Sequence, residues 1–318
     1  MSVKTWKRVI TLSVILIVVV LLATSLIFVT KNNRLSDTYE AVVADLESKE
    51  TAAPDPNQYL DLSAYDDLDA AQADTMLRFM IDMQNQDTLP YHDLYPDLYV
   101  DNDFAFEPVE KKTCYLTFDD GPDTELTVKI LDILKENNIK ATFFVVYKKG
   151  DAEKELYKRI VNEGHTIGIH TASHNYSTIY ASVEDYLKDF NRISKHIESI
   201  TGVKPEIFRF PGGSINGYNS TFYVELISEM LRRGYVYYDW NCSSGDAAAS
   251  NPSSSIIRDN VLKRAEFNKK IVLMHDSKGH SATVAALPEI IKGLTDQGYQ
   301  FDALTNDVAP ACFAYFKY

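Results

Sequence analysis

The chain has 318 residues, of which 45% are apolar, 12% are aromatic and 24% are charged, a composition typical of a globular protein. These values exclude a wholly disordered chain and a fibrous repeat, and the length allows one large domain or two modest ones. The net charge of −13 argues against a protein that binds nucleic acid through its phosphates.

The negative charge is confined to the first third of the chain. Residues 1–34 carry a net charge of +5, residues 35–110 carry −17, and residues 111–318 carry −1. Because the last of these segments is close to neutral, it is where we expect the chemistry.

Residues 9–29 form an uncharged run, VITLSVILIVVVLLATSLIFV, that predicts a membrane-spanning helix. A helix of this length is about 31 Å long, which matches the core of a bilayer. The run is longer than the apolar core of a signal peptide, and residues 30–33 lack the small side chains of a cleavage site. Basic residues precede the run, so we expect residues 1–31 to be an uncleaved anchor, with its N-terminus inside the cell and the remainder outside. The alternative is a cleaved signal peptide and a secreted protein.

Residues 32–105 are predicted to be an acidic stalk or a small accessory region. Aspartates crowd residues 61–74, and four prolines interrupt any long periodic element. Repulsion among the carboxylates should keep this segment extended. We therefore expect a spacer between the membrane and a domain over residues 106–318.

From about residue 113 onward, short apolar runs alternate with helical patterns. Strands are predicted at 114–118, 142–146, 166–170, 207–210, 235–240, 270–275 and 299–303. Helices are predicted between them at 126–137, 183–200, 221–233 and 282–297. This alternation predicts a parallel α/β sheet, either open or closed into a barrel.

Polar motifs follow five of these predicted strands. They are TFDDGP at 117–122, HTASH at 170–174, RFPGG at 209–213, DWN at 239–241 and LMHD at 273–276. In a parallel sheet the carboxyl ends of the strands meet at one edge, where such folds place their active sites. The sequence therefore predicts a single site built from all five motifs.

Two histidines and an aspartate predict a metal site. His170 and His174 are four residues apart, so both can point to one side of a turn or helix. With a carboxylate from Asp119 or Asp120 they make a two-histidine, one-carboxylate set, which leaves positions open on a catalytic zinc ion. Because neighbouring side chains at a strand end point in opposite directions, the other aspartate can act as a base. The same ligands also suit cobalt, nickel or manganese.

The RFPGG motif predicts two further catalytic groups. Arg209 ends an otherwise apolar strand, and a buried guanidinium needs a carboxylate partner, for which the aspartate that does not bind metal is the candidate. Gly212 leaves a main-chain N–H without a Cβ nearby, which suits the binding of an oxyanion.

His275 ends a strongly apolar strand and is predicted to be a general acid, with Asp239 opposite it to hold the imidazolium. Trp240 and Leu273 would form the walls of a small apolar pocket. These groups together predict metal-assisted hydrolysis, in which Asp119 accepts a proton from water and His275 donates one to the leaving group. The sequence contains no Ser or Cys nucleophile elbow, so we expect no covalent acyl-enzyme.

Taken in order, the five motifs resemble those of the polysaccharide deacetylase family, the NodB-homology domains of carbohydrate esterase family 4, over residues 106–318. The resemblance implies a distorted (β/α) barrel with about seven parallel strands. It also implies hydrolytic removal of acetyl groups from N-acetylated sugars with a divalent metal, usually zinc. By position it implies a base at Asp119, metal ligands at Asp120, His170 and His174, an arginine bracing the base at Arg209, an acid at His275 with Asp239 as its partner, and pocket walls at Trp240 and Leu273.

The sequence departs from the family pattern at RFPGG, where many members have Arg-Pro-Pro-Tyr-Gly, so that a glycine N–H would be the oxyanion donor. An exported, anchored member most resembles bacterial enzymes that deacetylate N-acetylglucosamine in peptidoglycan. A cell-wall glycan is therefore the expected partner, and no protein partner is implied. Two alternatives stay open: a deacetylase or O-acetyl esterase acting on a chitin-type polymer, poly-N-acetylglucosamine or xylan, and a catalytically weak domain that binds wall glycan.

Overall fold

The computed structural model describes residues 89–313, apart from 105, 107–108, 110 and 264–267. The predicted anchor and most of the predicted stalk lie outside the described residues, so both stay predictions. Within the described part, none of the helices has the length and the apolar character that crossing a membrane requires.

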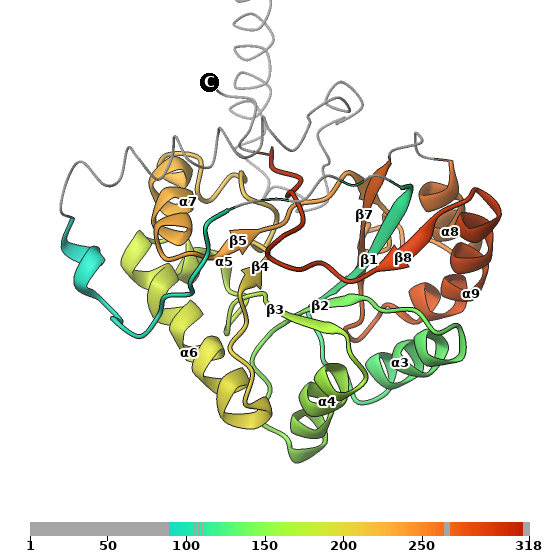
Figure 1. Cartoon of the computed structure of the whole chain (residues 1–318), viewed down its shortest axis with the longest axis horizontal. Coiled ribbons are helices and arrows are strands. Elements are labelled where there is room, and N and C mark those ends of the chain that lie inside the picture. Colours follow the sequence, from blue (N-terminus) through green and yellow to red (C-terminus); the bar gives the residue numbers. More distant parts are fainter. Residues whose placement is uncertain (1–88, 105, 107–108, 110, 264–267, 314–318) are drawn as a thin grey trace, which may run out of the picture. The chain divides into compact units, whose positions relative to one another are not determined.

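Eight strands form one sheet, in which every pairing is parallel (Figure 1). They are β1 (Thr113–Asp119), β2 (Thr142–Val145), β3 (Thr166–Ile169), β4 (Ile207–Phe208), β5 (Val236–Tyr237), β6 (Cys242–Ser243), β7 (Lys269–His275) and β8 (Gln300–Asp302). Their order is β5-β4-β3-β2-β1-β7-β6, and β8 pairs with the first half of β1. The predicted parallel α/β sheet is confirmed, and β6 is an additional strand that the sequence did not indicate.

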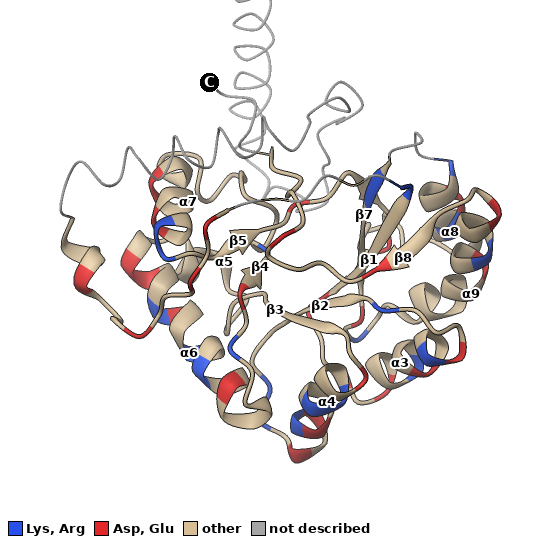
Figure 2. Ribbon diagram, in the orientation of Figure 1, with Lys and Arg blue, Asp and Glu red and all other residues tan. Residues whose placement is uncertain are grey.

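Helices occupy the outer side of the arc of strands (Figure 1). They are α3 (Leu126–Glu136), α4 (Asp151–Asn162), α5 (Tyr176–Ile179), α6 (Val183–Thr201), α7 (Tyr223–Arg232), α8 (Ser254–Leu262) and α9 (Ser281–Asp296). Acidic and basic residues are common along the outer helices, whereas few residues of the strands are charged (Figure 2). Among the charged residues of the strands, Asp119 ends β1 at the predicted site, whereas Lys269 and Lys270 lie at the opposite end of β7.

Local signals in the sequence set the ends of several helices. Ser182 caps α6, because its Oγ accepts a hydrogen bond from the Asp185 N–H at 3.1 Å. Gly234 and Gly298 follow α7 and α9 with φ values of +84°, a left-handed conformation that glycine adopts without steric cost. Both helices end within one residue of the ends predicted for them, 233 and 297.

The central strand of the fold is β1, which is buried along its whole length. Strand β7 pairs with it on one side, and β8 and β2 pair with its two halves on the other. The buried side chain of Phe118 on β1 stacks on Phe143 of β2 at a centroid distance of 5.2 Å. A strand covered on both faces is held rigidly, so β1 gives a firm base to the polar residues at its carboxyl end.

Residues 89–104 pack against α7 and contribute Tyr91 and Leu98 to the hydrophobic core. The fully buried Arg233 pairs with Glu229 at 2.6 Å. Its guanidinium also donates to four main-chain oxygens, those of Tyr91, Leu94, Tyr95 and Leu98. These contacts join residues 89–104, upstream of the domain predicted to begin at 106, to the body of the fold. A short 3-10 helix, η2 (Pro90–Asp93), starts this segment.

Arg233→Ala should lower the free energy of unfolding by about 3 kcal/mol or more, because it removes a buried ion pair with Glu229, which keeps only Arg232, together with four buried hydrogen bonds to main-chain oxygens. Denaturant unfolding would measure the loss. Arg258→Ala is the matched control, since the ion pairs of Arg258 with Asp259 and Glu289 lie on the surface and their loss should lower the free energy of unfolding much less. Equal losses in the two variants would contradict a structural role for the buried pair.

Candidate active site

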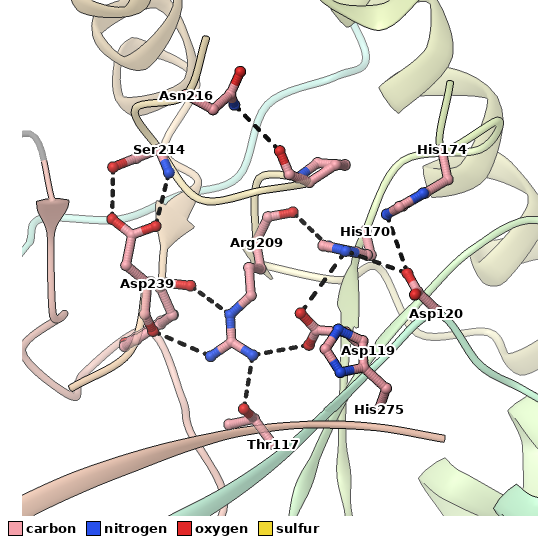
Figure 3. A network of polar contacts seen from close by, with 12 residues as sticks. Thr117, Asp119, Asp120, His170, His174, Arg209, Ser214, Asn216, Asp239 and His275 are labelled. Carbon is pink, nitrogen blue, oxygen red and sulfur yellow. Dashed lines mark hydrogen bonds and ion pairs between the residues drawn. The ribbon is translucent and has the colours of Figure 1, made fainter. Parts of the chain in front are cut away.

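The polar residues at the carboxyl ends of the strands lie together (Figure 3). Asp119 ends β1 and His275 ends β7, and the two residues are direct partners in the β1–β7 register. His170 follows β3 and Arg209 follows β4. The predicted convergence of the motifs on one edge is confirmed for these four residues.

Asp120, His170 and His174 form a cluster whose potential ligand atoms all lie within 4.8 Å of one another. The Asp120 Oδ1 atom is 3.1 Å from His174 Nε2 and 3.5 Å from His170 Nε2. Asp120, Thr171 and His174 have φ values of +74°, +68° and +50°. Left-handed conformations at residues other than glycine cost energy and cluster at functional sites, so their concentration here is consistent with a binding site.

The chemistry of His170 fits a bound cation. Its Nδ1 lies 2.9 Å from the main-chain oxygen of Arg209, which can only accept, so Nδ1 carries the hydrogen and Nε2 is left unprotonated in the neutral ring. Burial lowers the pKa of His170 to about 3, which keeps the ring neutral. The lone pair of Nε2 therefore faces the Asp120 carboxylate, whose buried Oδ1 has no hydrogen-bond partner among the described residues. A lone pair and an anion at this distance repel each other, and a metal ion between them would relieve that repulsion.

Arg209 is fully buried and its guanidinium holds Asp119 in place. Its Nη1 donates to Asp119 Oδ1 at 2.8 Å and to Thr117 Oγ1 at 2.7 Å, and its Nε donates to the main-chain oxygen of Tyr238 at 2.7 Å. The guanidinium also lies over the ring of Phe144, 4.4 Å from its centroid. The predicted contact between the arginine and the aspartate outside the metal cluster is present in the structure.

Burial raises the pKa of Asp119, whereas the charges of Arg209 and His275 limit this rise. A carboxylate with a raised pKa is a better proton acceptor near neutral pH than an exposed one. Asp119 Oδ2 faces the metal cluster and lies 3.8 Å from His170 Nε2. The environment of Asp119 therefore suits a general base beside the metal ligands.

The partner of His275 is Asp246, and the prediction that it is Asp239 is wrong. His275 Nδ1 lies 2.8 Å from Asp246 Oδ1, and the His275 N–H donates to Asp246 Oδ2. Thr283 also donates to that carboxylate, at 2.8 Å. Asp246 follows β6, a two-residue strand too short to leave a periodic pattern, so no pattern in the sequence indicated that Asp246 would reach the site.

Burial alone would lower the pKa of His275, but the charge and hydrogen bond of Asp246, together with the charges of Asp120 and Asp119, raise it to about 10. His275 is therefore protonated at neutral pH, as a general acid must be. The ring of His280 stacks on it at a centroid distance of 5.0 Å.

Asp239 is buried beside Arg209 but faces other partners. Its carboxylate accepts hydrogen bonds from the main-chain N–H and the Oγ of Ser214, at 2.8 and 2.5 Å, and from the Phe313 N–H at 2.6 Å. Burial raises the pKa of Asp239 to about 6, although these hydrogen bonds oppose the rise. Its place in the sequence, at the end of a predicted strand, did not reveal that it would point toward Ser214 rather than toward β7.

The remaining predicted residues lie nearby, but the structure does not test their roles. Gly212 has a φ of +76°, and its N–H donates no hydrogen bond to another described residue, so it is free to bind an oxyanion. Leu273 lies two residues before His275 on β7, so both side chains point to the same face. Trp240 is buried against Arg209 and Phe313. A pocket bounded by Trp240 and Leu273 stays a prediction.

Comparison with known proteins gives consistent matches. A family model described as polysaccharide deacetylase matches residues 106–227, ending upstream of Asp239, Asp246 and His275. A peptidoglycan-N-acetylglucosamine deacetylase of Bacillus cereus is 35% identical over 202 residues, which cover 62% of this chain and 71% of the relative.

Solved structures agree with this match. The catalytic domain of peptidoglycan N-acetylglucosamine deacetylase from Eubacterium rectale is similar with a TM-score of 0.60 and 37% identity, covering 63% of this chain and 92% of that one. A polysaccharide deacetylase from Bacillus cereus is similar with a TM-score of 0.58 and 34% identity, covering 64% of this chain and 98% of that one.

The full-length protein should bind a divalent metal at the Asp120 cluster. Adding zinc should raise the melting temperature of the wild-type protein, because a ligand that binds only the folded state stabilises it. In Asp120→Asn this increase should largely disappear, since the amide carries no charge. Asp132→Asn is the control, because Asp132 lies on the surface of α3, where it forms an ion pair with Arg159. An equal zinc response in wild type and Asp120→Asn would contradict the site.

Proposed function

Since the chain belongs to the polysaccharide deacetylase family, we propose that it hydrolyses the N-acetyl groups of a cell-wall polysaccharide, and that N-acetylglucosamine in peptidoglycan is its substrate. The observation that supports this most is the approach of three groups at one sheet edge: the Asp120 cluster, the buried Asp119 and the Asp246-paired His275. The names of the relatives support the choice of peptidoglycan.

Asp120, His170 and His174 would hold the divalent metal, for which we propose zinc. The chemistry that the metal supplies when bound is polarisation of the acetyl carbonyl and a lower pKa for a water molecule. Nitrogen and carboxylate ligands suit this ion, and cobalt, nickel or manganese could be held by the same set.

Each remaining group has a task that its surroundings support. Asp119, oriented by Arg209, would accept the proton of the attacking water. The free N–H of Gly212 would donate a hydrogen bond to the acetyl oxygen as that oxygen gains negative charge. His275, kept protonated by Asp246, would donate a proton to the sugar nitrogen as the amide bond breaks. An amine is a poor leaving group without this proton, so the acid is essential for an N-acetyl substrate.

Asp119→Asn should reduce acetate release at least about 100-fold, because the amide cannot accept the proton from water. We would measure acetate released by the zinc-loaded, full-length protein from purified peptidoglycan and from chitin oligomers. The zinc-dependent rise in melting temperature should persist, since Asp120, His170 and His174 remain. Full activity in this variant would contradict the assignment of the base.

The same assay separates the alternatives to peptidoglycan. Release from chitin oligomers alone would retain the chemistry and reject the proposed substrate. Release from O-acetylated xylan alone would indicate an esterase. Binding to the wall without release from any polymer would favour the glycan-binding alternative.

Asp246→Asn should shift the basic limb of the pH–rate profile to lower pH. Activity falls as pH rises through the pKa of His275, because the acid loses its proton. The amide removes the charge that raises this pKa, so the fall should begin at a lower pH than in the wild type. Thr283→Val, which removes only a hydrogen bond to Asp246, should shift the limb less. An unchanged limb in Asp246→Asn would reject His275 as the acid paired with Asp246.

We also propose, from the sequence alone, that residues 1–31 anchor the protein in the cell membrane with the catalytic domain outside. Cell fractionation should place the full-length protein in the membrane, and its intact mass should include residues 1–31. A protein in the medium that lacks this segment would instead identify it as a cleaved signal peptide.

A further inference from the structure

The structure gives Asp239 a set of contacts that the proposed reaction does not use. The residue is fully buried, and both of its carboxylate oxygens accept hydrogen bonds. Oδ1 accepts from the main-chain N–H of Ser214, and Oδ2 accepts from the Ser214 hydroxyl and from the Phe313 N–H. None of these donors belongs to β7, so the carboxylate does not act on His275 directly.

The main chain of Asp239 adds two contacts to different parts of the fold. Its carbonyl oxygen accepts from Arg209 Nη2 at 3.1 Å, and its N–H donates to the Ala311 oxygen at 2.8 Å. Asp239 therefore bonds to both ends of the loop 209–214, at Arg209 and at Ser214. It also bonds to residues 311 and 313, near the end of the described chain.

The Phe313 side chain lies against the same loop. Its ring meets the Trp240 ring edge to face, with centroids 4.8 Å apart. A Cβ added to Gly213 would lie 2.7 Å from a carbon of the Phe313 ring, which is closer than van der Waals contact allows. Gly213 therefore permits the chain end to pack directly behind the loop that carries Gly212.

We infer that Asp239 and Phe313 form a brace that positions the Gly212 N–H for the acetyl oxygen. Asp239 is in this view a positioning residue, because it acts through the loop and touches no reacting atom. The inference rests on the proposed function, in which Gly212 is the oxyanion donor. According to this inference, the active site requires residues 311–313, which lie about 100 residues after the loop 209–214 that they support.

Asp239→Asn is a sharp test of the carboxylate because it preserves the size of the side chain. Both carboxylate oxygens accept from main-chain N–H groups, so an amide must turn its own NH2 toward one of these donors and lose that hydrogen bond. A chain that ends at Cys312 removes the other half of the brace. A chain that ends at Phe313 is its matched control, since it keeps the N–H and the ring that contact Asp239 and Gly213.

The kinetic experiment compares these variants in the otherwise full-length, zinc-loaded protein. Asp239→Asn and the chain ending at Cys312 should each lower kcat for acetate release at least about tenfold, because a misplaced donor weakens binding of the transition state more than of the substrate. KM should change less than about twofold. The variant that combines the two changes should have a kcat little lower than that of either single variant, because both changes disrupt the same brace. The chain ending at Phe313 should retain the wild-type kcat.

Hydrogen exchange gives a readout that does not require activity. The peptide spanning residues 209–214 should exchange faster in Asp239→Asn and in the chain ending at Cys312 than in the wild type, whereas β1 should be unchanged. If the wild type releases no acetate, the proposed function fails, and exchange in this peptide still decides whether the brace exists.

Three results would overturn the brace. The first is a wild-type kcat in Asp239→Asn, and the second is a fold-loss of kcat in the combined variant equal to the product of the two single losses. The third is unchanged hydrogen exchange in the 209–214 peptide. A lower melting temperature with unchanged kcat would also overturn it, since it would show a purely structural role. Faster exchange in the loop with a lower kcat and an unchanged KM would support it.

Discussion

The buried guanidinium of Arg209 is the contact on which the arrangement of the site depends. Its side chain joins β1, through Thr117 and Asp119, to the segment that follows β5, through Tyr238 and Asp239. Its main-chain oxygen accepts from His170 and so sets which nitrogen of that ring faces the metal cluster. One residue thus orients the base and a metal ligand while it anchors the loop that carries Gly212. A lysine could not replace it, because one ammonium group cannot span acceptors that lie in several directions.

Burial of so many charged groups at one edge is possible because each has an opposite charge or a hydrogen bond nearby. The surroundings of the site keep one group as a proton donor and another as a proton acceptor. Asp246 keeps His275 protonated, and the neighbouring Asp119 is able to accept a proton. A metal ion would supply the missing positive charge between Asp120 and the two histidines. The proposed hydrolysis therefore follows from electrostatics as much as from the identity of the residues.

Close packing against Asp276 explains why residue 121, in the TFDDGP motif, is a glycine. A Cβ at Gly121 would lie 2.1 Å from the Asp276 carboxylate, so no other residue fits without displacing that side chain. Asp276 is buried, accepts a hydrogen bond from Thr127, and donates its N–H to the main-chain oxygen of Asp119. Burial raises the pKa of Asp276 to about 7. These contacts connect α3 and the end of β7 to the strand end that carries the two aspartates.

The sequence by itself determined the features that depend on neighbours along the chain. Apolar runs located seven of the eight strands, and the motifs at their ends located Asp119, Asp120, His170, His174, Arg209 and His275 at one edge of the sheet. The ends of the helices predicted at 183–200 and 221–233 agree with the cap at Ser182 and the glycine at 234, because capping depends on residues only a few positions apart. A parallel sheet then brings the strand ends together whatever the details of the loops.

Only the tertiary structure decided which carboxylate meets which partner. Asp239 and Asp246 both follow short strands, and neither residue type nor spacing shows which of them points to β7. The choice depends on the path of the chain through the two-residue strand β6, which is too short to show a period of two. It also depends on the return of residues 311–313 to the loop at 209–214, a contact between segments about 100 positions apart. Pairings of this kind are set by packing in three dimensions, and local sequence patterns carry no information about such packing.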